Sequence, residues 1–171
     1  MNARAHPKLA IRPLLVEDVP LLAEIFRASV EELTAEDYSE AQREAWASAA
    51  DDEEELGARL AGALTVVATL GGSVVGFASL ADNRQIDMLY VHPAAAGQGA
   101  GAMLCDALER LAAARGTPEI TVDASDTARV FFAKRGYAAQ RRNTVSLADE
   151  WLANTTMVKR LAAPAAKGSA S

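Results

Sequence analysis

The feature that most constrains this chain is an apolar run followed by closely spaced glycines, within residues 89–104. The run reads as a strand, then a short loop, then an amphipathic helix that opens at Gly97, Gly99 and Gly101. Glycines let backbone N–H groups approach a ligand closely, and the N-terminus of a helix favours negative charge. We therefore expect the loop to hold a phosphate-bearing ligand, most naturally a pyrophosphate.

The length of 171 residues, half of them apolar, suits one substantial core rather than two enzyme-sized domains. We predict a single domain over residues 8–161, with flexible tails at 1–7 and 162–171. No apolar run approaches the roughly 20 residues that span a bilayer, and the first residues lack the apolar block of a signal peptide. These patterns predict a cytoplasmic protein without a membrane partner. A lone cysteine, Cys105, and no histidine cluster predict neither a disulfide nor a metal site.

Charge is segregated along a chain whose formal net charge is −6. Residues 31–55 contain eleven acidic residues and one base, Arg43, whereas residues 127–148 contain five bases and no acid. The basic segment would suit an anionic ligand, although charge runs are more often solvated helix faces. An acidic chain without interleaved aromatic and basic residues is not expected to bind nucleic acid.

The hydrophobic periodicity predicts alternating strands and helices. A first strand at 8–14 precedes a helix capped by Asp18, a helix that starts at Ser39 with a capping box to Gln42, and a third helix at 51–62. Two β-rich runs around Gly71-Gly72 are typical of an antiparallel hairpin. The remaining expected elements are a strand at 85–91, a helix at 99–115, a strand at 119–123, a short helix at 126–135, and strands at 137–147 and 154–161.

One interpretation of the loop is a dinucleotide site, because residues 97–102 formally satisfy G-x-G-x-x-A and Asp123 follows about twenty residues later. That motif needs its first glycine almost directly after the strand, whereas residues 92–96 intervene here. The preceding strands also form a meander rather than a βαβ series. A dinucleotide-binding oxidoreductase is therefore the remote alternative.

Two sequence blocks support a different interpretation. The first is Val91-His92-Pro93 followed by Ala96-Gly97-Gln98-Gly99-Ala100-Gly101, and the second, within 124–137, contains Ala128-Arg129-Val130-Phe131-Phe132 and Gly136-Tyr137. With the order of elements, they resemble the GNAT superfamily of acyl-CoA-dependent N-acyltransferases over nearly the whole of residues 9–161. The resemblance implies an α/β fold of the α+β type. Its central sheet would be mixed and mostly antiparallel, with about six or seven strands, flanking helices and a split between the fourth and fifth strands.

The resemblance also implies an activity. The protein would move the acetyl group of acetyl-CoA, its acyl donor, to a primary amine by direct attack while both substrates are bound, without a metal. The acceptor would be a small-molecule amine or an amine of a peptide or protein. Because the helices after the first strand generally build the acceptor pocket in this family, the acidic segment 31–55 favours a cationic acceptor. The protein would be a monomer or a homodimer.

Binding roles carry over from the family to matched positions in this chain. The strand before the glycine loop would bind pantetheine through its backbone, and the loop amides would bind the pyrophosphate. The acetyl-CoA-binding set implied in this way is Leu89, Val91, Ala96, Gly97, Gln98, Gly99, Ala100, Gly101, Ala102, Phe131 and Phe132. Tyr38 and Trp46 lie in the segment expected to build the acceptor pocket and could shape that site, although aromatic residues at such spacing more often pack a helix onto a sheet.

The attacking amine must first lose a proton, and a carboxylate is the usual base. Asp87 is the first candidate, because a lone carboxylate among apolar strand residues is costly unless it is solvated or paired. It could instead pair with an arginine such as Arg84. Asp123 and Ser125 are second choices at the end of the next strand, although Ser125 could equally cap the helix that follows.

Two positions depart from the family pattern. Ala96 stands where an arginine or glutamine is usual, and Phe132 stands where many members have a tyrosine that protonates the departing thiolate. Since an alkyl thiol has a pKa of about 8.5, water could supply that proton. Tyr90 is the alternative donor, unless it packs in the core. The two departures leave a second function open. The protein could be a non-catalytic module that binds acyl-CoA through the loop without transferring the acyl group.

Overall fold

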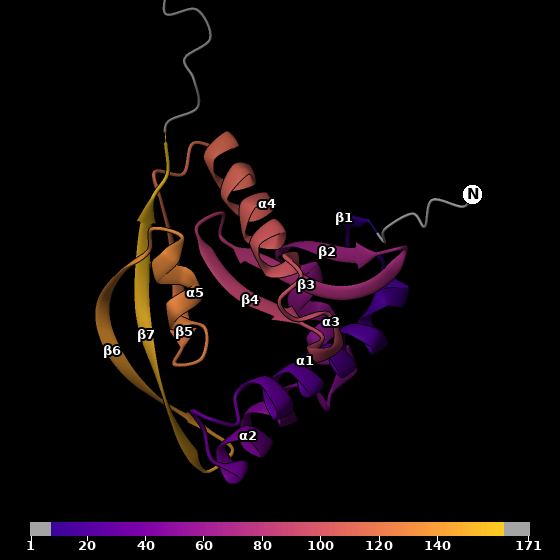
Figure 1. Cartoon of the computed structure of the whole chain (residues 1–171), viewed down its shortest axis with the longest axis vertical. Coiled ribbons are helices and arrows are strands. Elements are labelled where there is room, and N and C mark those ends of the chain that lie inside the picture. The colour runs from indigo at the N-terminus through magenta and orange to yellow at the C-terminus, as the bar shows by residue number, and fades with distance from the viewer. Residues whose placement is uncertain (1–7, 163–171) are drawn as a thin grey trace, which may run out of the picture.

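The computed structural model describes residues 8–162, which form a seven-stranded sheet in the order β1-β2-β3-β4-β5-β7-β6 (Figure 1). The strands are β1 (Leu9–Pro13), β2 (Leu64–Leu70), β3 (Ser73–Ala81), β4 (Gln85–Val91), β5 (Glu119–Ser125), β6 (Ala138–Leu147) and β7 (Glu150–Arg160). The helices are α1 (Val19–Leu33), α2 (Glu40–Ala47), α3 (Glu53–Ala61), α4 (Ala100–Ala114) and α5 (Arg129–Lys134). The predicted tails, apart from Ala162, lie outside the described residues.

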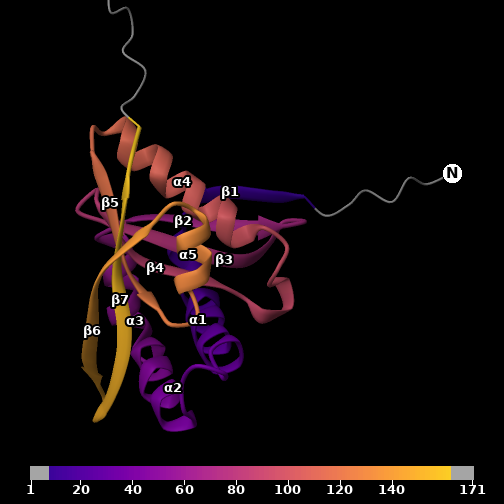
Figure 2. The same cartoon turned by 60° about the vertical axis from the view of Figure 1, so that its left-hand side comes forward.

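The sheet divides between β4 and β5. These two strands run parallel and pair only at Gln85 with Thr121 and Ile86 with Val122, whereas the other neighbouring strands are antiparallel. Beyond Ile86 the two strands separate, so β1–β4 form one arm and β5–β7 the other (Figures 1 and 2). The predicted mixed sheet, split between its fourth and fifth strands, is confirmed.

Helices cover both faces of the first arm. Helix α4 packs on one face around Leu104 and Leu108, and α1 to α3 pack on the other around Leu22, Phe26 and Leu60 (Figure 1). The core under α4 also includes Ile120 and Val122 of β5, so it continues from the first arm into the second. None of the helices within residues 8–162 is long and apolar enough to cross a membrane.

A β-bulge at Asp87 controls where the side chains of β4 point. On β3, Leu80 pairs with Ile86 and Ser79 pairs with Met88, so Asp87 has no partner there. Ile86 accordingly packs in the core under α4, while Met88 packs in the core under α1 to α3. The bulge turns Asp87 and Met88 toward the same side, where α3 lies.

The capping box that was predicted at the start of α2 is present. Ser39 Oγ accepts a hydrogen bond from the Gln42 N–H at 3.1 Å, and Gln42 Oε1 accepts one from the Ser39 N–H at 2.9 Å. The predicted cap of α1 by Asp18 is wrong, because its carboxylate accepts hydrogen bonds from the Arg12 guanidinium and the Leu15 N–H instead. Asp18 therefore links Arg12 of β1 to the turn before α1 through hydrogen bonds.

The antiparallel β2–β3–β4 meander excludes the dinucleotide interpretation of the glycine loop. A dinucleotide fold needs a series of parallel strands joined through helices. Here the strand that leads into the loop has antiparallel β3 on one side and only a short parallel contact with β5 on the other.

Candidate active site

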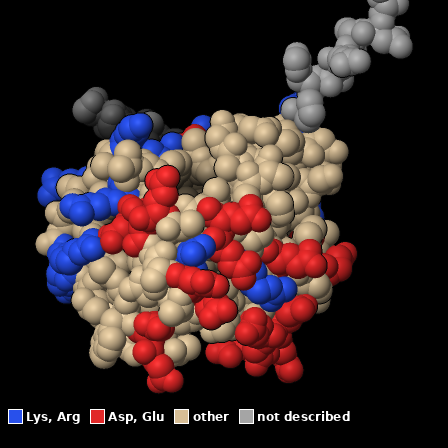
Figure 3. Space-filling view, turned by 60° about the horizontal axis from the view of Figure 1, so that its bottom comes forward, with Lys and Arg blue, Asp and Glu red and all other residues tan. Residues whose placement is uncertain are grey.

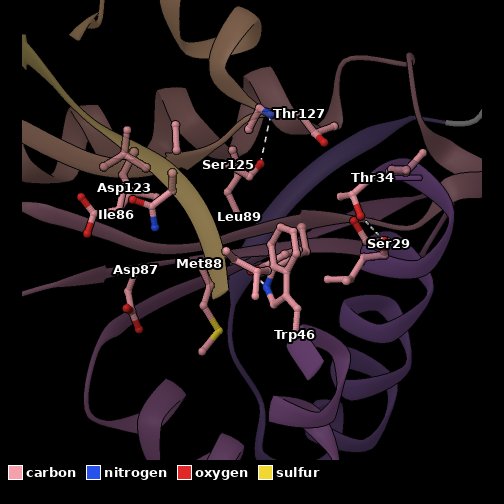
Figure 4. Close-up of a pocket in the computed structure, with 18 of the residues that line it drawn as sticks. Ser29, Thr34, Trp46, Ile86, Asp87, Met88, Leu89, Asp123, Ser125 and Thr127 are labelled. Carbon is pink, nitrogen blue, oxygen red and sulfur yellow. Dashed lines mark hydrogen bonds between the residues drawn. The ribbon is translucent and has the colours of Figure 1, made fainter. Parts of the chain in front are cut away.

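A pocket of about 450 Å³ occupies the opening between β4 and β5. Both strands line it, together with Gly101 at the start of α4, and α5 borders the same end. The opposite end is bordered by α1, α2 and the β6–β7 hairpin. Figure 4 shows Trp46 between Ser29 and Thr34 on one side and Asp87 and Met88 on the other. The volume is typical of small-molecule sites, which span about 300–1,000 Å³.

Two glycines of the loop adopt backbone angles that favour glycine. Gly97 has a φ of +78° and Gly99, the residue before α4, a φ of +93°, a region that side chains disfavour. Residues 96–99 are exposed. Since the first N–H groups of a helix lack partners within it, the start of α4 offers donors to an anion. The residues present therefore suit a pyrophosphate group.

The strand before the loop has a free edge. Leu89 and Val91 pair with β3 on one side, but β4 has no strand partner on its other side beyond Ile86 within residues 8–162. Both residues line the pocket. An extended ligand could therefore run along this edge of the strand.

Phe131 and Phe132 close the end of the pocket near the glycine loop. A Cβ added at Gly101 would lie 3.6 Å from the Phe131 ring, so the missing side chain leaves space there. Phe132 is buried, and its ring lies edge-on to those of Phe131 and Tyr137, with centroids 5.1 Å apart in each case. Phe132 therefore acts here as an apolar wall.

Asp87 is paired with an arginine, although not with Arg84. Its two carboxylate oxygens accept hydrogen bonds from Nε and Nη2 of Arg59 on α3, each at 2.8 Å. The pairing raises the pKa of Arg59. Asp87 is 23% exposed and lines the pocket together with Arg59. A bidentate pair of this kind fixes the direction of the carboxylate.

Tyr90 faces the pocket from within an aromatic cluster. Its ring lies 4.5 Å from that of Phe26 and 5.8 Å from that of Phe77, measured between centroids. Its oxygen accepts a hydrogen bond from Trp46 Nε1 at 3.2 Å. Burial raises the pKa of Tyr90 to about 12, so the phenol stays protonated near neutral pH.

The two second choices on β5 also line the pocket. Ser125 Oγ accepts a hydrogen bond from the Ala128 N–H at 3.1 Å, so this side chain caps the turn into α5. Asp123 Oδ1 accepts one from Thr156 Oγ1 at 2.6 Å and is exposed. Both residues lie on β5, whereas Asp87 lies on β4 on the other side of the opening (Figure 4).

Tyr38 joins three segments at the end of the pocket far from the glycine loop. Its hydroxyl donates to the Ala153 carbonyl at 2.7 Å and accepts from the Asp126 N–H at 2.9 Å. Its ring lies edge-on to Trp46, 5.4 Å between centroids. Burial raises the pKa of Tyr38, which keeps this hydroxyl a donor.

Sequence reasoning missed several residues that the fold brings to the pocket. Arg59 is a single basic residue on the polar face of a helix, and such a residue gives no indication in the sequence that it lines a site. Leu147 and Leu152 reach the pocket from the β6–β7 hairpin, far along the chain. No group of three or more His, Cys, Asp or Glu residues arranged to hold a metal occurs within residues 8–162.

Comparison with known proteins defines the class of this chain and then its family. The family model of the acetyltransferase (GNAT) domain matches residues 34–161. The uncharacterized N-acetyltransferase YafP of Escherichia coli (strain K12) is 32% identical over 149 residues, which cover 87% of this chain and 94% of the relative. This chain therefore belongs to the GNAT family and is an acetyl-CoA-dependent acyltransferase, as the sequence predicted.

Solved structures agree with this assignment. The crystal structure of a GCN5-related N-acetyltransferase from Rhodopseudomonas palustris superposes with a TM-score of 0.89 at 60% identity, covering 94% of this chain and 100% of the other. The PaiA N-acetyltransferase from Thermoplasma acidophilum, in complex with coenzyme A, has a TM-score of 0.72 at 22% identity, with coverages of 90% and 99%. The second likeness concerns the fold alone.

Proposed function

We propose that this protein transfers the acetyl group of acetyl-CoA directly to a primary amine while both substrates occupy the pocket between β4 and β5. One observation carries the proposal: the start of α4 at Gly101, the free edge of β4 and the aromatic end line one pocket. Gly101 and Leu89 line the same pocket as Asp87 and Trp46. A donor held by the loop would therefore reach an acceptor held near α2.

The donor end of the site is made by backbone and apolar side chains. The N–H groups of residues 97–102 would hold the pyrophosphate, and the edge of β4 at 89–91 would hold the pantetheine. Phe131 and Phe132 would flank the bound pantetheine. Ala96 supplies no side-chain donor, but backbone N–H groups at a helix start bind anions without one. The PaiA N-acetyltransferase, which shares the fold, is in complex with coenzyme A, and this supports coenzyme A as the donor's carrier.

Asp87 is the proposed base. Arg59 holds both carboxylate oxygens, yet each oxygen keeps a second lone pair that can accept the amine proton directly or through one water. The nitrogen forms a bond to the acetyl carbon, the carbon–sulfur bond breaks, and the electron pair leaves with the sulfur. The proton released by the amine passes to Asp87 or to water.

Tyr90 is proposed to stabilise the departing sulfur. A phenol with a pKa of about 12 is a weak acid toward a thiolate whose conjugate acid has a pKa of about 8.5. Tyr90 would therefore donate a hydrogen bond rather than surrender its proton. Ser125 is a second donor, because its bond with Ala128 leaves the hydroxyl hydrogen free. Asp123 would orient the acceptor from β5.

The test is product analysis with a panel of primary amines. Incubation with acetyl-CoA is expected to give one free coenzyme A thiol for each acetylated amine detected by mass spectrometry. Gly101→Leu would fill the space beside Phe131 and is expected to abolish acetyl-CoA binding in calorimetry while the thermal melt stays cooperative. A protein that binds acetyl-CoA but acetylates no amine in the panel would refute the proposal.

A further inference from the structure

The acidic residues that favoured a cationic acceptor do not reach the pocket. All eleven in residues 31–55 are described, and none is among the residues that line it. Figure 3 shows acidic side chains gathered on the outer surface of the molecule, with a basic group along one edge. All eleven acids are exposed, and the carboxylate of Asp37 contacts the lining through the hydrogen bond that it accepts from Thr127, so this charge faces solvent.

The acceptor end of the pocket is instead apolar. Its lining includes Val30 and Leu33 from α1, Trp46 from α2, Leu147 from β6 and Leu152 from β7. These five side chains come from four elements and carry one polar atom, the indole nitrogen. Bound groups at this end would therefore be recognised through apolar contact.

The polar groups at this end are largely committed within the protein. Thr34 Oγ1 donates to the Val30 carbonyl, and the indole N–H of Trp46 donates to Tyr90. The Tyr38 hydroxyl is used twice, and Asn154 Oδ1 accepts from Asn143. Ser29 also lines this end, but its hydroxyl is neutral. A second charged group on the acceptor would therefore lose its water without gaining an oppositely charged partner there, which is unfavourable.

Of the two carboxylates that line the pocket, Asp87 is neutralised by Arg59 through two hydrogen bonds. Asp123 accepts a hydrogen bond from Thr156, whose neutral hydroxyl does not offset the negative charge, so the lining has room for one positive charge. One ammonium group entering beside Asp87 can be accommodated, because it gives up its proton there. A polycation would bring further ammonium groups into the apolar end.

The far end of the site is bordered by contacts between the α1–α2 region and the second arm. Gln42 Nε2 donates to the Trp151 carbonyl at 2.7 Å, and Tyr38 donates to the Ala153 carbonyl. These contacts join the α1–α2 region to β7 beside the apolar lining. The pocket volume of about 450 Å³ lies within the range of small-molecule sites, which favours a small acceptor over a side chain on a protein surface.

We infer that the acceptor is a small primary amine with an uncharged, apolar body, of the arylalkylamine class. The inference rests on the proposed function and names the substrate class of the same site. The amine nitrogen lies beside Asp87, and the apolar body packs against Trp46, Leu33 and Leu147. The acidic outer surface takes no part in choosing the acceptor.

The test compares kcat/KM for three acceptors with acetyl-CoA: phenethylamine, spermidine and an N-terminally blocked peptide with one lysine. Phenethylamine is expected to be favoured at least about tenfold, because burying a phenyl-sized apolar group contributes that much or more. Leu147→Asp places a carboxylate in the apolar end. It is expected to lower the value for phenethylamine at least about tenfold and to reduce its advantage over spermidine, with the acetyl-CoA Kd unchanged.

A matched control removes charge from the outer surface. Glu36→Gln combined with Glu44→Gln, two exposed acids outside the pocket lining, is expected to leave all three kcat/KM values unchanged. A preference for spermidine or the peptide would overturn this inference while the proposed function stands. If the protein binds acetyl-CoA and acetylates none of the three amines or a wider panel, both are overturned.

Discussion

Asp87 and Arg59 occupy the pocket as one hydrogen-bonded unit, and this unit can have two different roles. If the pair only braces β4 against α3, loss of either partner should have a similar effect on the rate. If Asp87 is the base, its loss should be far more severe, because the base takes part in the reaction and the arginine only orients it.

Substitution of the two partners separates these roles. Asp87→Asn keeps the shape and is expected to lower kcat about 100-fold or more, the usual contribution of a general base. Arg59→Gln is expected to lower kcat less than about tenfold, and the double variant should match Asp87→Asn. Equal losses in the two single variants would contradict the role of Asp87 as the base.

A second prediction concerns Gly99, the glycine with left-handed backbone angles that precedes α4. Gly99→Ala forces a side chain into a φ of +93°, which should cost about 1 kcal/mol or more and displace the loop N–H groups. The Kd for acetyl-CoA in calorimetry should rise about tenfold, since 1.4 kcal/mol is tenfold.

Gly116→Ala is the matched control for this loop variant. Gly116 has a φ of +82° just beyond the other end of α4, and no atom lies within 4 Å of its added Cβ. It should lose similar stability without any change in the Kd. If both variants weakened acetyl-CoA binding equally, the loop would have no special role.

Among the elements, the β6–β7 hairpin and the β5–α5 turn are both contacted by one hydroxyl, that of Tyr38. Tyr38→Phe removes the partner of the Ala153 carbonyl and of the Asp126 N–H. Leaving such groups unpaired costs about 1–3 kcal/mol, so the free energy of unfolding in urea should fall by about that amount. Ser146→Ala on β6, an exposed position, should change it by less than about 0.5 kcal/mol. An equally small effect of Tyr38→Phe would show that these bonds do not stabilise the hairpin.

The sequence predicted elements with strong local signals and missed those without them. The strand at 85–91 and the start of α2 at Ser39 follow from apolar runs and a capping box, and the structure has both. The start of β7 lies at Glu150, four residues before the prediction, because the hairpin turns at Ala148-Asp149 with positive φ and no glycine. The bulge at Asp87 likewise carries no glycine or proline signal.

For the whole molecule, acid stability follows from paired carboxylates. A hydrogen bond from Arg12 lowers the pKa of Asp18, and one from Arg142 lowers the pKa of Asp126. A carboxylate with a lower pKa in the folded chain stabilises the fold above its unfolded pKa, and this contribution is lost as the pH falls through the folded value. The urea midpoint should therefore decline below about pH 4, near the ordinary pKa of aspartate.

Asp18→Asn tests this explanation. The variant should be less stable than the wild type at pH 7, and its urea midpoint should decline less steeply between about pH 5 and pH 2. Asp82→Asn, in the exposed turn between β3 and β4, should keep the full decline. An unchanged slope for Asp18→Asn would mean that other groups control acid unfolding.

The topology of the whole molecule was predictable because the order of strands, helices and glycine loop is distinctive. The candidate site was only partly predictable. Asp87, Tyr90 and Trp46 were selected from the sequence and line one pocket, but the pairing of Asp87 with Arg59 depends on the bulge and on how α3 packs. The separation of the acids in residues 31–55 from the pocket depends on which helix faces are buried, and net charge does not reveal it.

The most direct test of the central claim is a crystal structure of this protein grown with coenzyme A. We predict the pyrophosphate against the N–H groups of residues 97–102, the pantetheine along β4 at 89–91, and the thiol inside the pocket near Asp87. Coenzyme A bound elsewhere, or a pyrophosphate away from the glycine loop, would contradict the account.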